Sequence, residues 1–301
     1  MQDRQERINK TLILTQTDPE TDMMFKNWIQ CGLHADILFN DIPKPLRAVR
    51  RVAINAKLPS TFYGIWLRKS WVRDIMKYDT FIIHAGDWTR NIATFIHSIN
   101  QNARIIYWYW NVVNPLSTPN KVRDKNVEFW TFDPNDANKY GMKLNIQYYS
   151  PIKVNHVKSS YDIYYVGHDH GRGDKVRKFE NQVKSLGLTT RFDLIPDNGR
   201  LIPYEDVCGR ILKSKAILEI NQSVQVGYTL RTMESLFMEK KLITDNPLTK
   251  KLDFYNPNNI FIWDGKNTDE VPTFLKQEYD TSVNKFKAKY DIFAWFENFF
   301  N

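Results

Sequence analysis

Hydrophobic residues in the first half of the chain form short apolar runs that alternate with segments of helical character. The strand-like runs cover residues 10–16, 78–84, 103–110 and 127–132. Helical segments are expected at residues 23–32, 88–99 and 134–140, and within 88–99 apolar side chains recur every three or four positions. Because strands that alternate with helices pair in parallel, this half predicts an α/β layer fold.

A second strand–helix series begins after a polar stretch at residues 150–160, which is interpreted as a linker. Its strand-like runs cover residues 161–166, 190–195, 216–220, 241–244 and 259–263, and its helical segments cover 175–186, 203–214 and 230–240. The sequence thus predicts two Rossmann-like domains, at residues 1–150 and 151–280. The aromatic, helix-like segment 281–301 is predicted to pack back on the N-terminal domain.

The composition suits a protein with two hydrophobic cores. Of 301 residues, 42% are hydrophobic, and no run reaches the roughly 18 apolar residues that a membrane-spanning helix needs. The polar N-terminus lacks the apolar segment of a signal peptide. Cys31 and Cys208 lie far apart and form no Cys-x-x-Cys pair. We therefore expect a cytoplasmic protein with reduced thiols.

The net charge of +8 is concentrated in one segment. Residues 44–73 contain eight Lys and Arg, no Asp or Glu, and several aromatic side chains. Such a segment can bind an anionic membrane surface, which would place the protein peripherally at the inner face of the plasma membrane, or attract an anionic substrate. The alternative is a solvated helix face. No nucleic-acid-binding module is recognisable, so no nucleic-acid partner is predicted, although the charge alone would permit one.

The loop at residues 221–231 is the strongest candidate for chemistry, because it follows a buried strand and precedes a helix. Ligands of open α/β sheets bind beyond the carboxyl ends of strands, and a helix N-terminus attracts phosphate. Gly227 would let the backbone approach a diphosphate, Thr229 and Arg231 would donate to it, and Glu234 would accept from a ribose diol. In the alternative interpretation, Arg231 pairs with Glu234 or Glu205 and nothing binds.

The run from Gly227 to Asn246 resembles the donor-site segment of bacterial GT-B glycosyltransferases that build surface polysaccharides. Residues 107–111 and 130–140 also look like that group. The resemblance implies two Rossmann-like domains that face each other across a cleft, with the sugar donor in the C-terminal domain and the acceptor in the N-terminal one. The chain departs from the commonest pattern because it lacks a second glycine just before the helix that bears Glu234.

The resemblance also implies roles for individual residues around the donor. Glu234 would hold the ribose, and the diphosphate would be surrounded by Gly227, Tyr228, Thr229 and Arg231. Gly167, at the end of the first strand of the second domain, is similar to the glycine in the turn that faces the interdomain cleft in this family.

In the segment after this turn, Arg172 and Lys175 would neutralise the leaving diphosphate. Ile195 and Tyr204 resemble the positions that hold the base, although either residue can equally serve in packing. The cluster of His168, Asp169 and His170 is a weak indication of a metal site.

An acceptor hydroxyl must lose a proton as it attacks, so a general base is expected in the first domain. Asp87 is favoured, since it follows a glycine-containing turn at the end of a strand. His84 and Asp18 are further candidates. The alternative for Asp87 is an N-cap of a helix that starts at Trp88.

No Asp-x-Asp, which GT-A enzymes use to hold a divalent cation, occurs in the sequence. The prediction is therefore a metal-independent glycosyltransferase without a cofactor, acting on a UDP- or GDP-linked sugar and a glycan or lipid-linked acceptor. A non-catalytic protein of the same fold that binds a nucleotide or an anionic glycan is the alternative.

Overall fold

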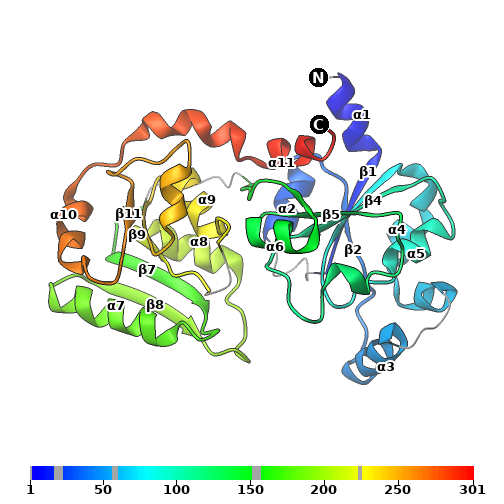
Figure 1. Cartoon of the computed structure of the whole chain (residues 1–301), viewed down its shortest axis with the longest axis horizontal. Helices are drawn as coiled ribbons and strands as arrows, with labels where there is room; N and C mark the ends of the chain where they lie inside the picture. Colours follow the sequence, from blue (N-terminus) through cyan, green and yellow to red (C-terminus); the bar gives the residue numbers. More distant parts are fainter. Residues whose placement is uncertain (1, 17–22, 56–59, 151–156, 223–225) are drawn as a thin grey trace. The chain divides into compact units, whose positions relative to one another are not determined.

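The computed structural model describes residues 2–16, 23–55, 60–150, 157–222 and 226–301, and the chain divides into two compact units (Figure 1). The first unit comprises Met1–Asn145 and the second Ile146–Asn301. The division therefore falls between Asn145 and Ile146, close to the expected boundary at residue 150. Most of the expected linker, residues 151–156, lies outside the described residues.

The first unit is built on a six-stranded sheet in which all neighbouring strands are parallel. Its strands are β1 (Thr11–Thr15), β2 (Ala35–Ile37), β3 (Thr80–His84), β4 (Arg104–Tyr109), β5 (Glu128–Thr131) and β6 (Lys143–Leu144). Its helices are α1 (Gln2–Asn9), α2 (Met23–Gln30), α3 (Lys44–Asn55), α4 (Lys69–Arg73), α5 (Ile92–His97) and α6 (Pro134–Tyr140). Short 3-10 segments are η1 (Ser60–Trp66), η2 (Ile75–Lys77) and η3 (Pro119–Lys121).

The second unit repeats this plan with five parallel strands. These are β7 (Tyr161–His168), β8 (Thr190–Ile195), β9 (Ser214–Glu219), β10 (Lys241–Thr244) and β11 (Ile260–Ile262). Its helices are α7 (Gly173–Ser185), α8 (Tyr204–Leu212), α9 (Leu230–Phe237), α10 (Val271–Lys276) and α11 (Ile292–Asn298). The 3-10 segments are η4 (Pro247–Lys251), η5 (Thr268–Glu270) and η6 (Thr281–Lys289).

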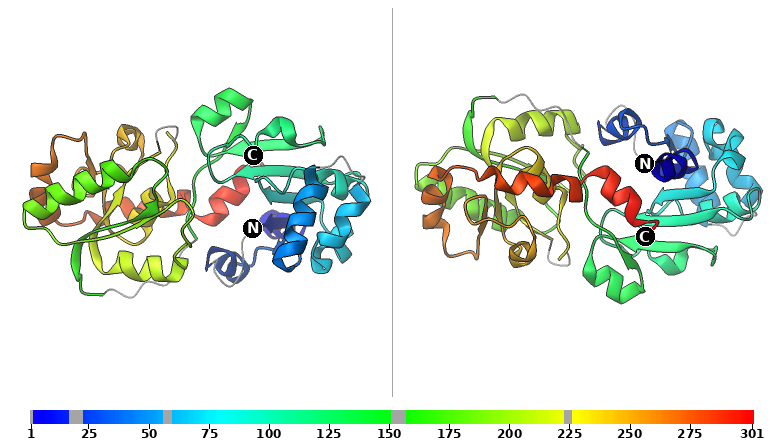
Figure 2. Two further views of the ribbon diagram at one scale, coloured as in Figure 1. Left: turned by 90° about the horizontal axis from the view of Figure 1, so that it is seen from below. Right: turned by 90° about the horizontal axis from the view of Figure 1, so that it is seen from above.

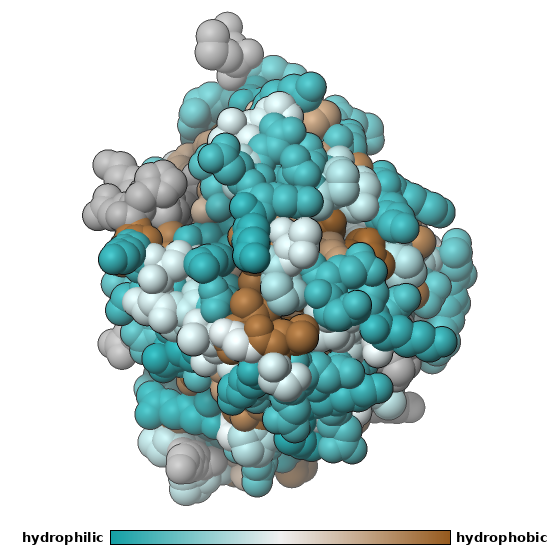
Figure 3. Space-filling view, turned by 90° about the vertical axis from the view of Figure 1, so that its left-hand side faces the viewer, coloured by the Kyte–Doolittle hydropathy of each residue, from teal (hydrophilic) through white to brown (hydrophobic). Residues whose placement is uncertain are grey.

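Alternation along β7 shows why helices cover both faces of the second sheet. Ile163 and Tyr165 pack with α7 and α10, whereas Tyr164 and Val166 pack with α8 and α9 on the other side. Because successive side chains of a strand point to opposite faces, a strand that is apolar throughout needs cover on both. Figure 2 shows the helices on either side of the sheets, and the surface seen in Figure 3 is mainly hydrophilic with small apolar patches.

The two sheets share one strand order. The first reads β2-β1-β3-β4-β5-β6 and the second β8-β7-β9-β10-β11, so in both the second strand of the unit lies outside the first and the later strands extend the other way. This is the doubly wound order in which ligands bind at the switch point, beyond the carboxyl ends of the two strands where the winding reverses. The predicted pair of Rossmann-like domains is confirmed. Their arrangement across a cleft stays a prediction.

Several elements differ from the expectation. Strands β2 and β6, with three and two residues, are too short to give a pattern, and helix α1 lies in the polar N-terminus. The helix expected from Trp88 begins only at Ile92, because Gly86 and Thr89 close a turn in which the Thr89 hydroxyl bonds the Gly86 backbone. The N-cap of α5 is Asn91, so the interpretation of Asp87 as an N-cap is wrong.

The C-terminal segment belongs to the second unit. Trp295 of α11 is fully buried, and its ring lies 4.5 Å from that of Tyr148. The expected packing of residues 281–301 on the first domain stays a prediction. Among the described residues, no helix combines the length and the apolar character needed to cross a membrane.

Candidate functional site

A pocket of about 370 Å³ lies at the switch point of the second sheet. Its wall includes Arg172 and Lys175 from the segment after β7, Asn221 and Gln222 after β9, and Asp245 after β10. The pocket therefore opens at the carboxyl ends of three neighbouring strands, where an open α/β sheet binds its ligands. Arg172 and Lys175 were both expected at the donor diphosphate.

Arg172 links the two strands that diverge at this point. Its Nε donates to the carbonyl oxygen of His168 at the end of β7 (2.9 Å), and its Nη1 donates to that of Ile220 just after β9 (2.7 Å). A Cβ at position 167 would lie 2.8 Å from Arg172 Nη2, so the guanidinium would have to shift from this place. Gly167 thus leaves room for the close approach of Arg172, and Nη2 is the guanidinium nitrogen that has no acceptor among the described residues.

Lys175 holds its charge at the mouth of the pocket. Its Nζ lies 2.6 Å from Asp245 Oδ2, and the lysine side chain is 49% exposed while that of Asp245 is 7% exposed. The other oxygen of Asp245 accepts from the backbone N–H of Asn221 (2.9 Å). The Asn221 Oδ1 atom is buried and has no hydrogen-bond partner among the described residues. Two cations and one carboxylate leave the pocket net positive, which favours an anionic ligand.

The loop between β7 and α7 satisfies its own polar groups. Asp169 Oδ1 accepts from the backbone N–H groups of Gly171 (3.1 Å) and Gly173 (2.9 Å), so a carboxylate already occupies the N-terminus of α7. The rings of His168 and His170 stack, and their Nδ1 atoms bond to Pro196 O and Asp197 Oδ1. Within the part of the chain that the structure describes, no three His, Cys, Asp or Glu side chains are grouped to hold a metal.

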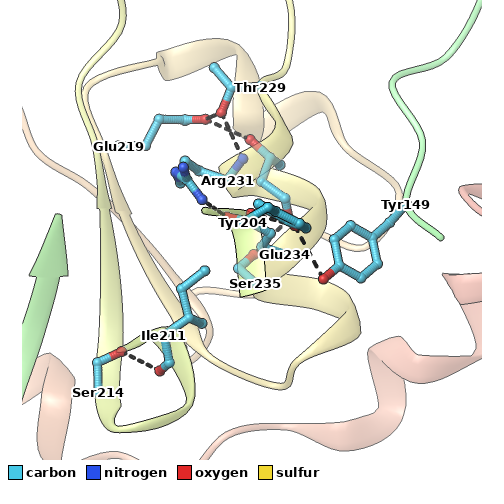
Figure 4. Close-up of polar contacts among 10 residues, drawn as sticks. Tyr149, Tyr204, Ile211, Ser214, Glu219, Thr229, Arg231, Glu234 and Ser235 are labelled. Atoms are coloured by element: carbon cyan, nitrogen blue, oxygen red, sulfur yellow. Dashed lines mark hydrogen bonds and ion pairs between the residues drawn. The ribbon is translucent and has the colours of Figure 1, made fainter. Parts of the chain in front are cut away.

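Arg231 and Glu234 of α9 are paired with each other (Figure 4). The Glu234 side chain is fully buried, and its Oε1 accepts from the hydroxyl of Tyr204 (2.7 Å), which also lies 3.3 Å from the Tyr149 hydroxyl. Burial alone would lower the pKa of Arg231, but the charge of Glu234 raises it. Arg231 thus pairs with Glu234, as the alternative interpretation expects, and each oxygen of Glu234 already has a partner. The role of Glu234 at a ribose stays a prediction.

The N-terminus of α9 rests on a buried carboxylate that the sequence analysis missed (Figure 4). Thr229 caps the helix by accepting from the Arg231 N–H (3.0 Å), and its hydroxyl donates to Glu219 Oε1. Thr232 donates to the same oxygen (2.9 Å), and Thr244 donates to Oε2 (2.5 Å). Burial raises the pKa of Glu219, and the three hydroxyl donors only partly oppose that shift.

The other residues expected at the donor have packing partners. Tyr228 is half-buried and donates to the Leu248 carbonyl (3.2 Å), and Ile195 and Tyr204 lie in or against the apolar cluster under α8 and α9. Their observed contacts are thus apolar packing and hydrogen bonds within the second unit. Gly227 is buried in the turn before α9, and residues 223–225 of its loop lie outside the described part, so its approach to a phosphate stays a prediction.

His84 ends β3 at the switch point of the first sheet. Its ring packs against the edge of Trp28 (5.1 Å) and stacks on Trp110 (5.8 Å). Burial lowers the pKa of His84 to about 3, so its imidazole is neutral and weakly basic at neutral pH. This environment disfavours His84 as a general base.

Asp87 lies three residues beyond β3 and is half-buried. Its backbone carbonyl accepts from Arg90 Nε (3.1 Å), but no hydrogen bond or ion pair to its carboxylate occurs among the described residues. Of the sequence candidates for a base, Asp87 thus keeps an available carboxylate at the first switch point. Asp18 falls outside the residues that the structure describes.

The pair in α9 gives a stability prediction. Arg231→Met should lower the free energy of unfolding by about 3 kcal/mol, because it leaves the Glu234 carboxylate buried without its cation. Adding Glu234→Gln should restore part of that loss, since the Tyr204 hydroxyl keeps an acceptor. Urea denaturation of both single variants and the double variant measures this. Losses that simply add in the double variant would show that the two side chains are not coupled.

The raised pKa of Glu219 predicts a pH dependence. The folded state holds the proton more tightly than the unfolded chain, so this group's contribution to stability is complete below about pH 4.5 and is lost as the pH rises through the folded pKa. Glu219→Gln cannot ionise. Its melting temperature relative to wild type should therefore rise between pH 4 and pH 7, and a constant difference would contradict the assignment.

No protein-family model and no curated protein sequence match the chain. Solved structures with a similar fold include Acinetobacter baumannii MurG (11% identity, TM-score 0.42, covering 96% of this chain and 98% of that one). Two others are the spinosyn forosaminyltransferase SpnP (9%, 0.48, 96% and 97%) and an α1,3-fucosyltransferase (13%, 0.43, 93% and 78%).

Proposed function

We propose that the chain is a glycosyltransferase that moves a sugar from a nucleoside diphosphate to an acceptor hydroxyl. The observation that carries this proposal is the chemistry at two equivalent switch points. In the second unit this point holds a positively charged pocket with Arg172 and Lys175, and in the first it holds Asp87 with an available carboxylate. An anion site and a base are the two groups that such a transfer requires.

The donor would bind with its diphosphate beside Lys175 and the free nitrogen of Arg172. A pocket of about 370 Å³ is within the range of small-ligand sites. The phosphate would compete with Asp245 for Lys175, while the buried Asn221 Oδ1 would accept a hydrogen bond from the nucleoside. Two cationic side chains supply the charge that a divalent metal supplies in other transferases, which supports metal-independent transfer.

The acceptor would bind near Asp87, which would take the hydroxyl proton. The resemblance of residues 227–246 to polysaccharide-building enzymes supports a glycan or a lipid-linked glycan as the acceptor, a UDP- or GDP-linked sugar as the donor, and a cytoplasmic location. The contacts of Glu234 shift the expected ribose acceptor away from α9 and towards Asn221 and Asp245.

Removal of the Lys175 charge should weaken donor binding. Lys175→Met is expected to lower the affinity for UDP or GDP about tenfold, because one charge-assisted contact to phosphate is lost. The measurement is the nucleotide-dependent rise in melting temperature. Lys178→Met, which changes an exposed lysine of the same helix outside the pocket, is the control and should match wild type. A wild type that neither nucleotide stabilises would refute the donor site.

Asp87→Asn should separate catalysis from binding. Release of nucleoside diphosphate from UDP-glucose or GDP-mannose should fall on the order of 10²-fold, because the amide cannot accept the proton. The stabilisation by UDP or GDP should stay at the wild-type level. If wild type binds nucleotide but shows no turnover of any nucleotide sugar with or without a glycan acceptor, the protein is a binding module.

A further inference from the structure

Helix α3 presents one apolar side to solvent. Leu46, Val49 and Val52 recur every three residues and are 44%, 54% and 69% exposed. Residues at this spacing share one side of a helix. A helix on a soluble domain normally buries this side and presents its charges to water.

The opposite side of α3 holds the contacts with the first unit. Ile54 is 2% exposed, and the Ala53 carbonyl accepts from the Tyr63 hydroxyl (3.1 Å). The guanidinium groups of Arg50 and Arg51 lie over the rings of Phe39 (4.3 Å) and Trp88 (4.9 Å). The basic side of the helix is therefore fixed against aromatic rings of the domain, and this attachment leaves the apolar side outward.

Segment η1 adds apolar side chains to the same region. It adjoins α3 through the bond from Tyr63, and its Phe62 and Ile65 are 56% and 68% exposed. In Figure 1, α3 lies at the margin of the first unit, away from the strands of its sheet. Single exposed apolar side chains are common on protein surfaces, but five large ones on two adjoining elements form a patch of the kind that marks an interaction site.

Charge decides between the possible occupants of this surface. Three nearby carboxylates, of Asp36, Asp41 and Asp74, pair with Arg68, Arg47 and Arg73. Residues 44–73 still keep an excess of five positive charges. A second copy of the chain would bring the same charges and repel, whereas anionic lipid headgroups attract them while the acyl boundary receives apolar side chains.

We propose that α3 and η1 form a membrane-docking element that lies in the plane of an anionic lipid surface. Leu46, Val49 and Val52 enter the boundary between headgroups and acyl chains, with Phe62 and Ile65 beside them. The exposed side chains of Arg68, Lys69 and Arg73 remain at headgroup level, as long basic side chains do at interfaces. This inference is independent of the sugar-transfer proposal, because no residue of the pocket in the second unit takes part.

Co-sedimentation with vesicles tests the element on the full chain. The probes are vesicles of phosphatidylcholine alone and of phosphatidylcholine with about one third phosphatidylglycerol, a content that gives the surface the anionic character of a natural leaflet. Wild type should bind the anionic vesicles at least tenfold more tightly, and added salt should weaken this binding. Equal binding to both vesicles, or none to either, would overturn the proposal.

The matched variants separate insertion from charge. Val49→Ser with Val52→Ser should reduce binding to anionic vesicles at least tenfold, since two exposed side chains lose their apolar contact with the membrane. Val157→Ser with Leu201→Ser, at exposed positions in the second unit, should leave binding unchanged. Equal loss in both double variants would contradict the assignment to α3. So would a wild-type dimer in sedimentation velocity that the Val49 and Val52 changes abolish, because the surface would then belong to a second copy.

Discussion

In each parallel sheet the chain winds first to one side of the first strand and then to the other, so two loops diverge at the carboxyl edge. In the second unit, Arg172 lies where these loops diverge, between the ends of β7 and β9. Its guanidinium bonds to the end of β7 and to the residue after β9. The two neighbouring strands are therefore joined by a side chain although they are not consecutive in the chain. The pocket lies beside this tie, with Arg172 in its wall and the Lys175–Asp245 pair next to it. Because two of its nitrogens are bonded to backbone carbonyls, Arg172 acts mainly as part of the frame, and Lys175 carries the more available charge.

Helix α9 is held by charges that the protein satisfies internally. Glu219 receives three threonine hydroxyls at the helix start, and Glu234 is bonded to Arg231 and Tyr204 one turn further on. Buried carboxylates are tolerated when donors surround them, and such fully bonded groups fix one arrangement of the chain. The segment that most resembles a donor site is therefore bonded within the protein, whereas the charged side chains that line the pocket follow β7 and β10.

The alternation of strands and helices was sufficient to predict both Rossmann-like domains, because strands buried on two faces leave long apolar runs such as that of β7. The positions of Arg172, Lys175 and Asp87 at carboxyl ends followed from the same pattern. The pattern does not predict which group each charged side chain contacts, because the same sequence lets Arg231 pair with Glu234 or with a phosphate. Glu219 carried a signal that was passed over: a lone carboxylate inside the apolar run 216–220, with threonines at 229, 232 and 244. The short strands β2 and β6 exist only through pairing with longer neighbours.

The contact between Gly167 and Arg172 has a consequence for variation in related chains. A Cβ at position 167 would lie 2.8 Å from Arg172 Nη2 and 3.0 Å from the Tyr165 hydroxyl, so the guanidinium would have to leave its place between the two strands. The two positions are therefore expected to change together, because a side chain at position 167 fits more easily where position 172 carries a shorter residue. Related chains in which both positions 167 and 172 differ would then join the ends of these two strands through another side chain.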